Sequence, residues 1–184
     1  MIKMTKGKAP QVLKDNKKKW TKQYQETGNF SWHGKRKEIM DNLKKATKNH
    51  CAFCDDVLKP IGSERGQIEH FRPKAEYKHF AFAWNNLYPI CSLCNNTKLE
   101  RFDKLLLRPD EKDFDFFDWF ELDLQTFELK PYKFGNSNWK RAEKTIKLYG
   151  FNKEEQIERR QEVYDEIQEG IYQNRKDKQP FRYM

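Results

Sequence analysis

Long apolar stretches are missing from this 184-residue sequence, which has no run of the roughly 18 residues that a membrane-spanning helix needs. Residues 1–8 also lack the apolar segment of a secretory signal, so we expect a cytoplasmic protein with no membrane contact. Apolar residues make up 36% of the chain and charged residues 35%, and the mean hydropathy is −1.11. An aromatic content of 15% argues against general disorder and favours one folded domain with terminal extensions.

Cysteine is scarce, and all four cysteines belong to two C-x-x-C pairs, Cys51 with Cys54 and Cys91 with Cys94. In a chain expected to stay in a reducing cytoplasm, this spacing is typical of a metal site rather than of disulfides. Four thiolates complete the tetrahedral shell of a structural Zn²⁺ ion, with iron in a rubredoxin-like site as the alternative. The spacer of 36 residues exceeds the about 15–20 of a compact zinc ribbon, which indicates an insertion between the pairs.

Positive charge is concentrated at one end of the chain. The net charge is +9, but residues 1–50 carry 14 Lys and Arg against 4 Asp and Glu, whereas residues 51–184 carry 23 against 24. Basic N-terminal arms commonly follow phosphate backbones, and a solubilising tail is an equally good interpretation of the charge alone. We interpret residues 1–34, which show little periodicity, as a basic N-terminal arm.

Outside the insertion, apolar periodicity predicts two elements in the regions 35–49 and 113–132. The first is a helix, because Ile39, Leu43 and Ala46 fall on one stripe. The second alternates acids with aromatics and is typical of a β-hairpin that turns near Gln125.

Two further helices are predicted near the C-terminus. Residues 138–149 form the first, which ends at Gly150, and the second begins at Asn152, which forms a capping-box-like pair with Glu155. The apolar stripe expected on the second consists of Ile157, Tyr164, Ile167 and Ile171. We expect residues 179–184 to be frayed.

The insertion itself contains a short strand and leads into a helix. Residues 67–71 are β-compatible and are bounded by Gly66 and Pro73, which predicts a strand that ends at His70. A short helix from Cys94 to about residue 102 places Asn95 near its first turn.

Glu69 and His70 bring acid and base chemistry to this strand. Adjacent strand residues point to opposite faces, so the carboxylate can bind a cation while the imidazole faces a water molecule. Hydrolysis of a phosphodiester needs a base to activate water and a cation to offset the charge on the phosphate. An isolated Glu-His dipeptide is nevertheless a weak signal, since most are structural or exposed.

Four motifs taken together resemble the HNH endonucleases with a ββα-metal core. They are Cys51-x-x-Cys54, Ile68-Glu-His-Phe-Arg-Pro-Lys74, Trp84-Asn-Asn-Leu87 and Cys91-x-x-Cys94-Asn95-x-x-Lys98. More narrowly, the chain looks like the PtuB-like nucleases of Septu-type and retron-associated anti-phage systems. This resemblance covers residues 50–165 and reaches the segment 143–152.

The resemblance implies a role for several residues of the insertion. His70 matches the general base, and Glu69 matches a metal-binding acid, although many HNH enzymes have Asp or His at that place. Asn95 matches the final metal ligand, where an amide oxygen suits a catalytic Mg²⁺ or Mn²⁺ ion. Asn86 matches the asparagine that orients the base, with Asn85 as the alternative.

The remaining polar residues of the region are assigned weaker roles. Ordinary surface charge explains the candidate phosphate contacts almost as well as function does; these are Arg72, Lys74 and Lys98. His50 is interpreted either as a bystander or as a hydrogen-bond donor to the cysteine sulfurs, and His33 and His79 are interpreted as structural.

These interpretations combine into an α+β fold with a ββα-metal core stapled by a four-cysteine zinc site and flanked by helices and a β-hairpin. Residues 35–184 would form one nuclease domain, with its core in 50–102 and a helical extension in 138–175. The resemblance implies nucleic acid as substrate, DNA in the first place, and an ATPase as partner in defence. The alternatives are a non-catalytic zinc-knuckle module that binds nucleic acid and a nuclease that cleaves RNA or tRNA.

Overall fold

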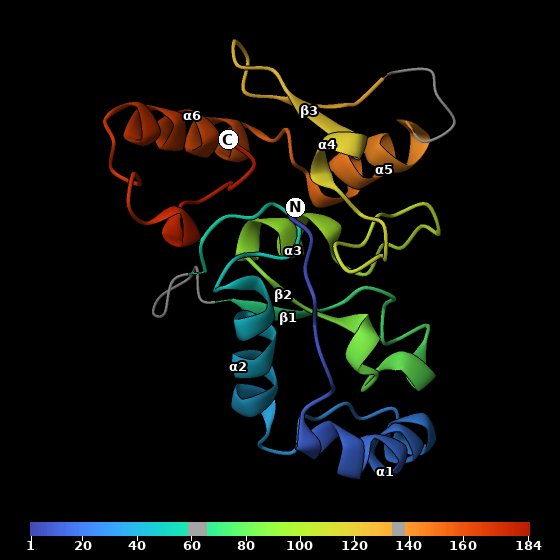
Figure 1. The fold of residues 1–184 in the computed structure, drawn as a ribbon. Coiled ribbons are helices and arrows are strands. Elements are labelled where there is room, and N and C mark those ends of the chain that lie inside the picture. The colour runs from blue at the N-terminus through green and yellow to red at the C-terminus, as the bar shows by residue number, and fades with distance from the viewer. Residues whose placement is uncertain (59–65, 134–138) are drawn as a thin grey trace.

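Helices and two small antiparallel sheets are stacked in three tiers in the computed structural model, which describes residues 1–58, 66–133 and 139–184 (Figure 1). The α+β class predicted from the sequence is therefore confirmed. The helices are α1 (Gln11–Thr27), α2 (Arg36–Thr47), α3 (Ser92–Lys98), α4 (Phe116–Trp119), α5 (Trp139–Tyr149) and α6 (Glu154–Gln168). The strands are β1 (Gln67–His70), β2 (Leu87–Ile90), β3 (Phe120–Leu122) and β4 (Leu129–Pro131), with 3-10 turns η1 (Lys78–Phe80), η2 (Trp84–Asn86) and η3 (Lys176–Lys178).

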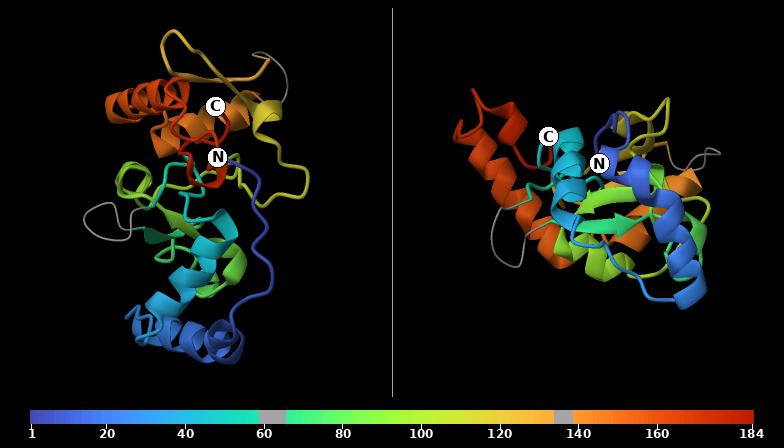
Figure 2. Two further views of the ribbon diagram at one scale, coloured as in Figure 1. Left: turned by 60° about the vertical axis from the view of Figure 1, so that its left-hand side comes forward. Right: turned by 90° about the horizontal axis from the view of Figure 1, so that it is seen from below.

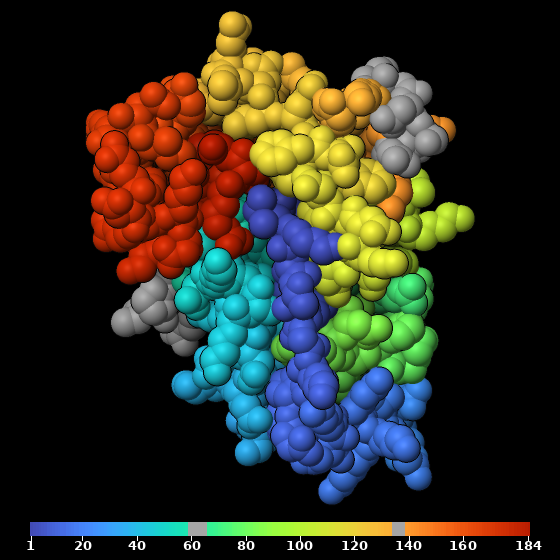
Figure 3. All heavy atoms as spheres, in the orientation of Figure 1, coloured from blue at the N-terminus to red at the C-terminus, as the bar shows by residue number. Residues whose placement is uncertain are grey.

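The two ends of the chain lie close together beside the middle tier (Figures 1 and 2). Figure 2 shows α1 and α2 at one end, the β1–β2 sheet with α3 in the middle, and α4, α5 and α6 at the other end. The first residues run across the surface of the middle tier (dark blue in Figure 3), where the amide of Met4 donates to the carbonyl of Pro109 at 2.8 Å. Within the described part of the chain, no helix is both long and apolar enough to span a membrane.

The middle tier follows the chain order β1, β2, α3. The strands pair antiparallel, with Glu69 opposite Tyr88 and His70 opposite Leu87. The predicted strand ending at His70 is confirmed, and the predicted helix is confirmed with earlier bounds, because Cys91 rather than Cys94 lies at its N-cap. This arrangement brings α3 alongside β1.

Two hydrophobic clusters hold the tiers together. The larger surrounds the cysteines and includes Phe53, Tyr88 and Tyr149, with Phe53 and Tyr149 stacked at 4.0 Å between ring centroids. The smaller joins α1 and α2 to the segment around Phe82. Residues 1–34, for which the sequence indicated no element, contain the 17-residue helix α1, whose Trp20 is buried in the smaller cluster. The N-terminal segment therefore packs on the body of the protein.

The predicted hairpin is present but shorter than expected. Strands β3 and β4 pair antiparallel with Leu122 opposite Leu129, and Gln125 lies in the connection. The preceding residues form α4 instead, because the side chain of Asp115 caps it by accepting from the amide of Phe117 at 2.9 Å. Local capping thus replaces part of the predicted strand.

Helix α5 matches its prediction over the described residues, with Gly150 following in the left-handed conformation (φ 66°); residue 138 lies outside the described residues.

The predicted cap of α6 is wrong. Asn152 uses its side chain to bond both the amide and the carbonyl of Leu129 at 2.8 Å, and Lys153 precedes the helix without a side-chain cap. Both polar atoms of the Asn152 side chain therefore bond to β4, and Oδ1 is not used to cap the helix.

The buried face of α6 also differs from the predicted apolar stripe. Its buried residues are Gln156, Arg160 and Val163, whereas the predicted Ile171 lies beyond the end of the helix and is 43% exposed. Arg160 is fully buried because its Nε atom donates to the carbonyl of Phe127 at 2.6 Å. Polar contacts with the hairpin, which periodicity does not reveal, turn the helix to this face.

The expected fraying of the C-terminus is wrong. Phe181 and Tyr183 are buried, and Tyr183 stacks on Phe116 at 4.2 Å. Asp55, directly after the first cysteine pair, accepts hydrogen bonds from the amide of Arg182 at 2.8 Å and from its guanidinium. The tail therefore closes over the cysteine knuckle.

Candidate functional site

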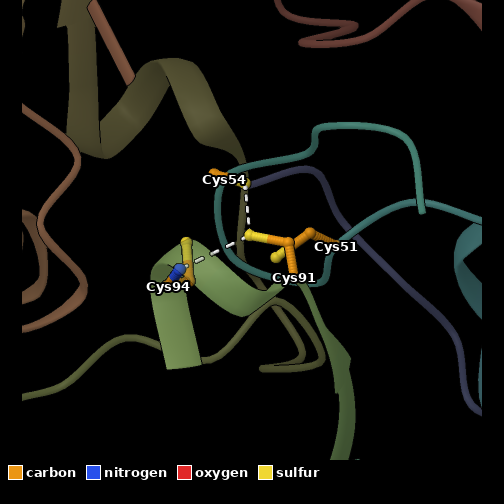
Figure 4. A group of neighbouring side chains, drawn as sticks. All are labelled: Cys51, Cys54, Cys91 and Cys94. Atoms are coloured by element: carbon orange, nitrogen blue, oxygen red, sulfur yellow. Dashed lines mark hydrogen bonds between the residues drawn. The ribbon is translucent and has the colours of Figure 1, made fainter. Parts of the chain in front are cut away.

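The side chains of the four cysteines converge on one another, as Figure 4 shows. Cys51 and Cys54 lie in the turn that follows α2, and Cys91 and Cys94 begin α3. All four side chains are buried, and their Sγ atoms lie within 4.8 Å of one another, with Cys54 and Cys91 at 3.6 Å. A tetrahedral zinc site with Zn–S bonds of about 2.3 Å places its sulfurs about 3.8 Å apart. The cluster could therefore hold a metal ion such as zinc.

Burial makes a bound cation more favourable at this cluster. Desolvation raises the pKa of the Cys54 thiol well above its ordinary value, because a thiolate there has lost its water. A cation that replaces the thiol protons removes this penalty. Gln156 donates from Nε2 to Sγ of Cys94 at 3.8 Å, a contact that nothing in the sequence signalled.

His50 contacts the backbone rather than a sulfur atom. Its Nε2 atom lies 2.9 Å from the carbonyl oxygen of Gln179 and its Nδ1 atom 2.8 Å from that of Lys48. These contacts fasten the start of the cysteine knuckle to the C-terminal segment. They agree with its interpretation as a bystander to the four-cysteine shell.

Glu69 forms a buried ion pair. The carboxylate, 5% exposed, lies on β1 with Oε1 at 2.5 Å from Nζ of Lys98, a side chain with no exposed surface. Burial raises the pKa of Glu69, and the positive charge of Lys98 opposes that rise. Lys98 was expected to contact phosphate, and the structure places it instead inside the protein against the candidate metal ligand.

His70 ends β1 and is 8% exposed. Its Nε2 atom lies 2.9 Å from the carbonyl oxygen of Ala81, which can only accept, so Nε2 carries the proton and Nδ1 is left as an acceptor. Burial lowers the pKa of His70 to about 4, which keeps the imidazole neutral near pH 7. The rings of Phe30 and Trp32 contact the imidazole, and the sequence pattern did not indicate either.

Asn86 ties together the chain on both sides of the site. Its Oδ1 atom accepts from the amide of Arg72 at 2.8 Å, and its Nδ2 atom donates to the carbonyls of Arg72 at 3.0 Å and Phe80 at 3.2 Å. Asn85 is exposed and offers its backbone carbonyl to the hydroxyl of Tyr88. The bracing contacts that the sequence left open between the two asparagines belong to Asn86.

Asn95 lies in α3 beside the first strand. Its Nδ2 atom donates to Oε1 of Gln67 at 2.6 Å, at the start of β1. This hydrogen bond uses the amide nitrogen and not the oxygen that would ligate a cation. The half-buried side chain thus joins the helix to the strand that carries Glu69 and His70.

The two other candidate phosphate contacts remain at the surface. Arg72 is exposed, with its guanidinium carbon 4.7 Å from the ring centroid of Phe80. Lys74 is half-buried, and its ammonium lies 5.4 Å from the ring centroid of Phe30. Both cations therefore lie in the segment that directly follows His70.

Comparison with known proteins gives two relatives and no family model that matches the chain. The chain is 33% identical over 98 residues to a Septu protein PtuB from Bacillus thuringiensis, a match covering 53% of this chain and 37% of that protein. It is 26% identical over 166 residues to a Septu protein PtuB from Bacillus mycoides, covering 73% of this chain and 53% of that protein. The chain thus spans about half or less of the length of these relatives.

Proposed function

We propose that this chain is a metal-dependent HNH endonuclease that hydrolyses phosphodiester bonds in nucleic acid, with DNA as the expected substrate. The observation that carries the proposal is the chain order β1, β2, α3, in which His70 ends β1, Asn86 precedes β2 and Asn95 lies in α3. The motif resemblance assigns base, brace and ligand to these three residues. Residues 50–102 would be the catalytic core of a nuclease domain 35–184.

His70 is the proposed general base. Its Nε2–H group is engaged by the carbonyl of Ala81, so Nδ1 is the atom that accepts a proton from the attacking water. The lowered pKa keeps the ring neutral, as a base requires. Asn86 holds the backbone of Arg72 from both sides and so restricts the segment directly after the base.

Glu69 and Asn95 are the proposed holders of a catalytic Mg²⁺ or Mn²⁺ ion, since carboxylate and amide oxygens are the ligands that such hard cations take. A divalent cation there would offset the charge that builds up on the scissile phosphate. Exposed Arg72 and half-buried Lys74 would contact the phosphate backbone. The four cysteines would hold a structural Zn²⁺ ion that fixes the start of α3.

The names of the two relatives support a place for this chain in anti-phage defence. Both are called Septu protein PtuB, which agrees with the resemblance to nucleases of Septu-type and retron-associated systems. We therefore propose a cytoplasmic effector that acts with an ATPase partner. This proposal concerns only the part of the relatives that aligns with this chain, which is 37% of one and 53% of the other.

The test is cleavage of plasmid DNA and of total RNA by the purified protein with Mg²⁺, with Mn²⁺ and with a chelator. We expect metal-dependent cutting that His70→Ala abolishes with the fold and bound zinc retained, because the proton acceptor is lost. His79→Ala is the matched control, since this exposed histidine follows the same strand and belongs to none of the four motifs. Cutting by His70→Ala at the parent's rate would show that the base is assigned wrongly.

The second candidate is a non-catalytic zinc-knuckle module that binds nucleic acid. The burial of both Glu69, by Lys98, and His70, by aromatic rings, favours it. A module of this kind would shift nucleic acid in a gel without cutting it under any of the metal conditions. The same assay therefore separates the two functions.

A further inference from the structure

Residues 28–34 form a strap that joins α1 to α2 and crosses the candidate base. The indole of Trp32 stacks on the imidazole of His70, with ring centroids 5.6 Å apart and planes 13° apart. Phe30 meets the same imidazole edge-on at 5.3 Å and 87°. With Ala81 holding Nε2, these contacts leave His70 8% exposed. The strap thus covers much of the imidazole ring of His70.

The strap is attached to the body of the protein through its rings. Phe30 stacks on Phe82 at 5.1 Å and 12°, and Trp32 meets Phe82 at 5.8 Å. In the parts of the chain that the structure describes, the hydrogen bonds of residues 29–34 are made only with residues 27–35, such as the one from the amide of Lys35 to the carbonyl of Trp32. Opening the strap therefore breaks aromatic contacts and no hydrogen bond to the site.

A glycine stands at each end of the strap. Gly28 and Gly34 have φ values of 71° and 76°, and no atom lies within 4 Å of the place that a Cβ would take at either. Both positions use the left-handed conformation that glycine adopts without strain. The strap thus has backbone freedom at both ends and open space around them, as a movable segment needs.

We propose that residues 28–34 are an autoinhibitory strap that covers His70 and must lift before nucleic acid reaches it; this rests on the proposed function. A phosphate group and its attacking water must approach Nδ1 within hydrogen-bond distance. Trp32 and Phe30, which both contact the imidazole, would hinder that approach. Trp32 contributes two aromatic pairs between the strap and the body, with His70 and with Phe82, and losing both changes an opening equilibrium by about fivefold to 150-fold.

The test measures the accessibility of His70 by its modification with diethyl pyrocarbonate, followed by peptide mass spectrometry, in the full chain. In the parent, His70 should react more slowly than the exposed His79. Trp32→Ala should raise the modification rate at His70 by about fivefold to 150-fold and leave the rate at His79 unchanged. Asn29→Ala is the matched control, because this exposed strap residue has no ring against His70. Trp32→Leu serves if the alanine variant does not fold.

The same variants are then assayed for cleavage. Faster cutting by Trp32→Ala, with Asn29→Ala like the parent, supports an inhibitory strap. An unchanged rate of modification at His70 overturns the strap, whatever the cleavage result. Reduced cutting by a folded Trp32→Ala variant whose His70 has become accessible also overturns it, because the indole would then position the base. A strap that opens in a protein cutting no substrate under any condition would overturn the proposed function and leave the cover itself supported.

Discussion

Lys98 and Glu69 form an ion pair inside the protein, with 2.5 Å between Nζ and Oε1 and almost no exposed surface on either side chain. The pair joins the last turn of α3 to β1, next to the candidate base. The ammonium also lies 3.5 Å from the carbonyl oxygen of His70. A cation supplied by the chain itself thus neutralises the carboxylate that is proposed to bind metal.

Lys98→Met is expected to lower the free energy of unfolding by about 3–5 kcal/mol, because it leaves the carboxylate of Glu69 buried without a partner. The double variant Glu69→Gln with Lys98→Met should lose less than Lys98→Met alone, since it removes both charges. Urea unfolding of the parent, of the single variants Glu69→Gln and Lys98→Met, and of the double variant measures the coupling. Lys37→Met, which breaks the exposed pair with Asp41, is the control and should leave the free energy of unfolding almost unchanged. Additive losses in the double variant would contradict the coupling.

Asn86→Ala is expected to destabilise the protein by about 2–4 kcal/mol, because it removes three hydrogen bonds worth about 0.5–1.5 kcal/mol each. It should also slow cleavage, since the backbone of Arg72 loses its brace. Asn85→Ala removes only an exposed side chain and should change neither property. Urea unfolding and the plasmid assay on both variants make the comparison, and equal effects at the two positions would contradict the assignment of the brace to Asn86.

Cys91→Ser is expected to abolish bound zinc and to lower the melting temperature by about 10 °C or more, because the four-sulfur cluster contributes metal-binding free energy to folding. Elemental analysis of the purified protein and a thermal melt are the measurements. Ser92→Ala, at the neighbouring position of α3, should keep both the zinc and the melting temperature. A parent protein that lacks zinc and melts at the same temperature as Cys91→Ser would refute the structural metal site.

Lys6 makes stability depend on pH. Its ammonium lies 3.3 Å from Asp110 and 3.2 Å from the ring centroid of Tyr88, and burial lowers the pKa of Lys6 to about 7. An unfolded lysine keeps its proton to about pH 10, so between pH 7 and 10 the unfolded state binds more protons and stability rises with pH. Lys6→Met removes this contribution.

We therefore expect the free energy of unfolding of the parent, relative to Lys6→Met, to increase by about 2 kcal/mol from pH 7 to pH 9. Urea unfolding of both proteins at the two pH values gives this difference directly. Parallel behaviour of parent and variant would show that Lys6 keeps its proton in the folded protein.

The local chemistry of the site could be predicted from the sequence. The C-x-x-C pairs are brought together and the strand Gln67–His70 forms. These features depend on side-chain chemistry and on spacing over a few residues, which a sequence shows directly. The same holds for α2 and α5, whose apolar stripes face the core.

Only the tertiary structure decided which surfaces those elements share. It placed Trp32 on His70, buried Lys98 against Glu69, and turned α6 so that Arg160 faces the hairpin. Each of these contacts joins residues far apart in the chain. A lysine or an arginine is buried only when its partner has been brought to it by the whole fold, because desolvating an unpaired charge is too costly. Apolar periodicity carries no record of such a partner, and so the burial of Glu69 and His70 could be seen only in three dimensions.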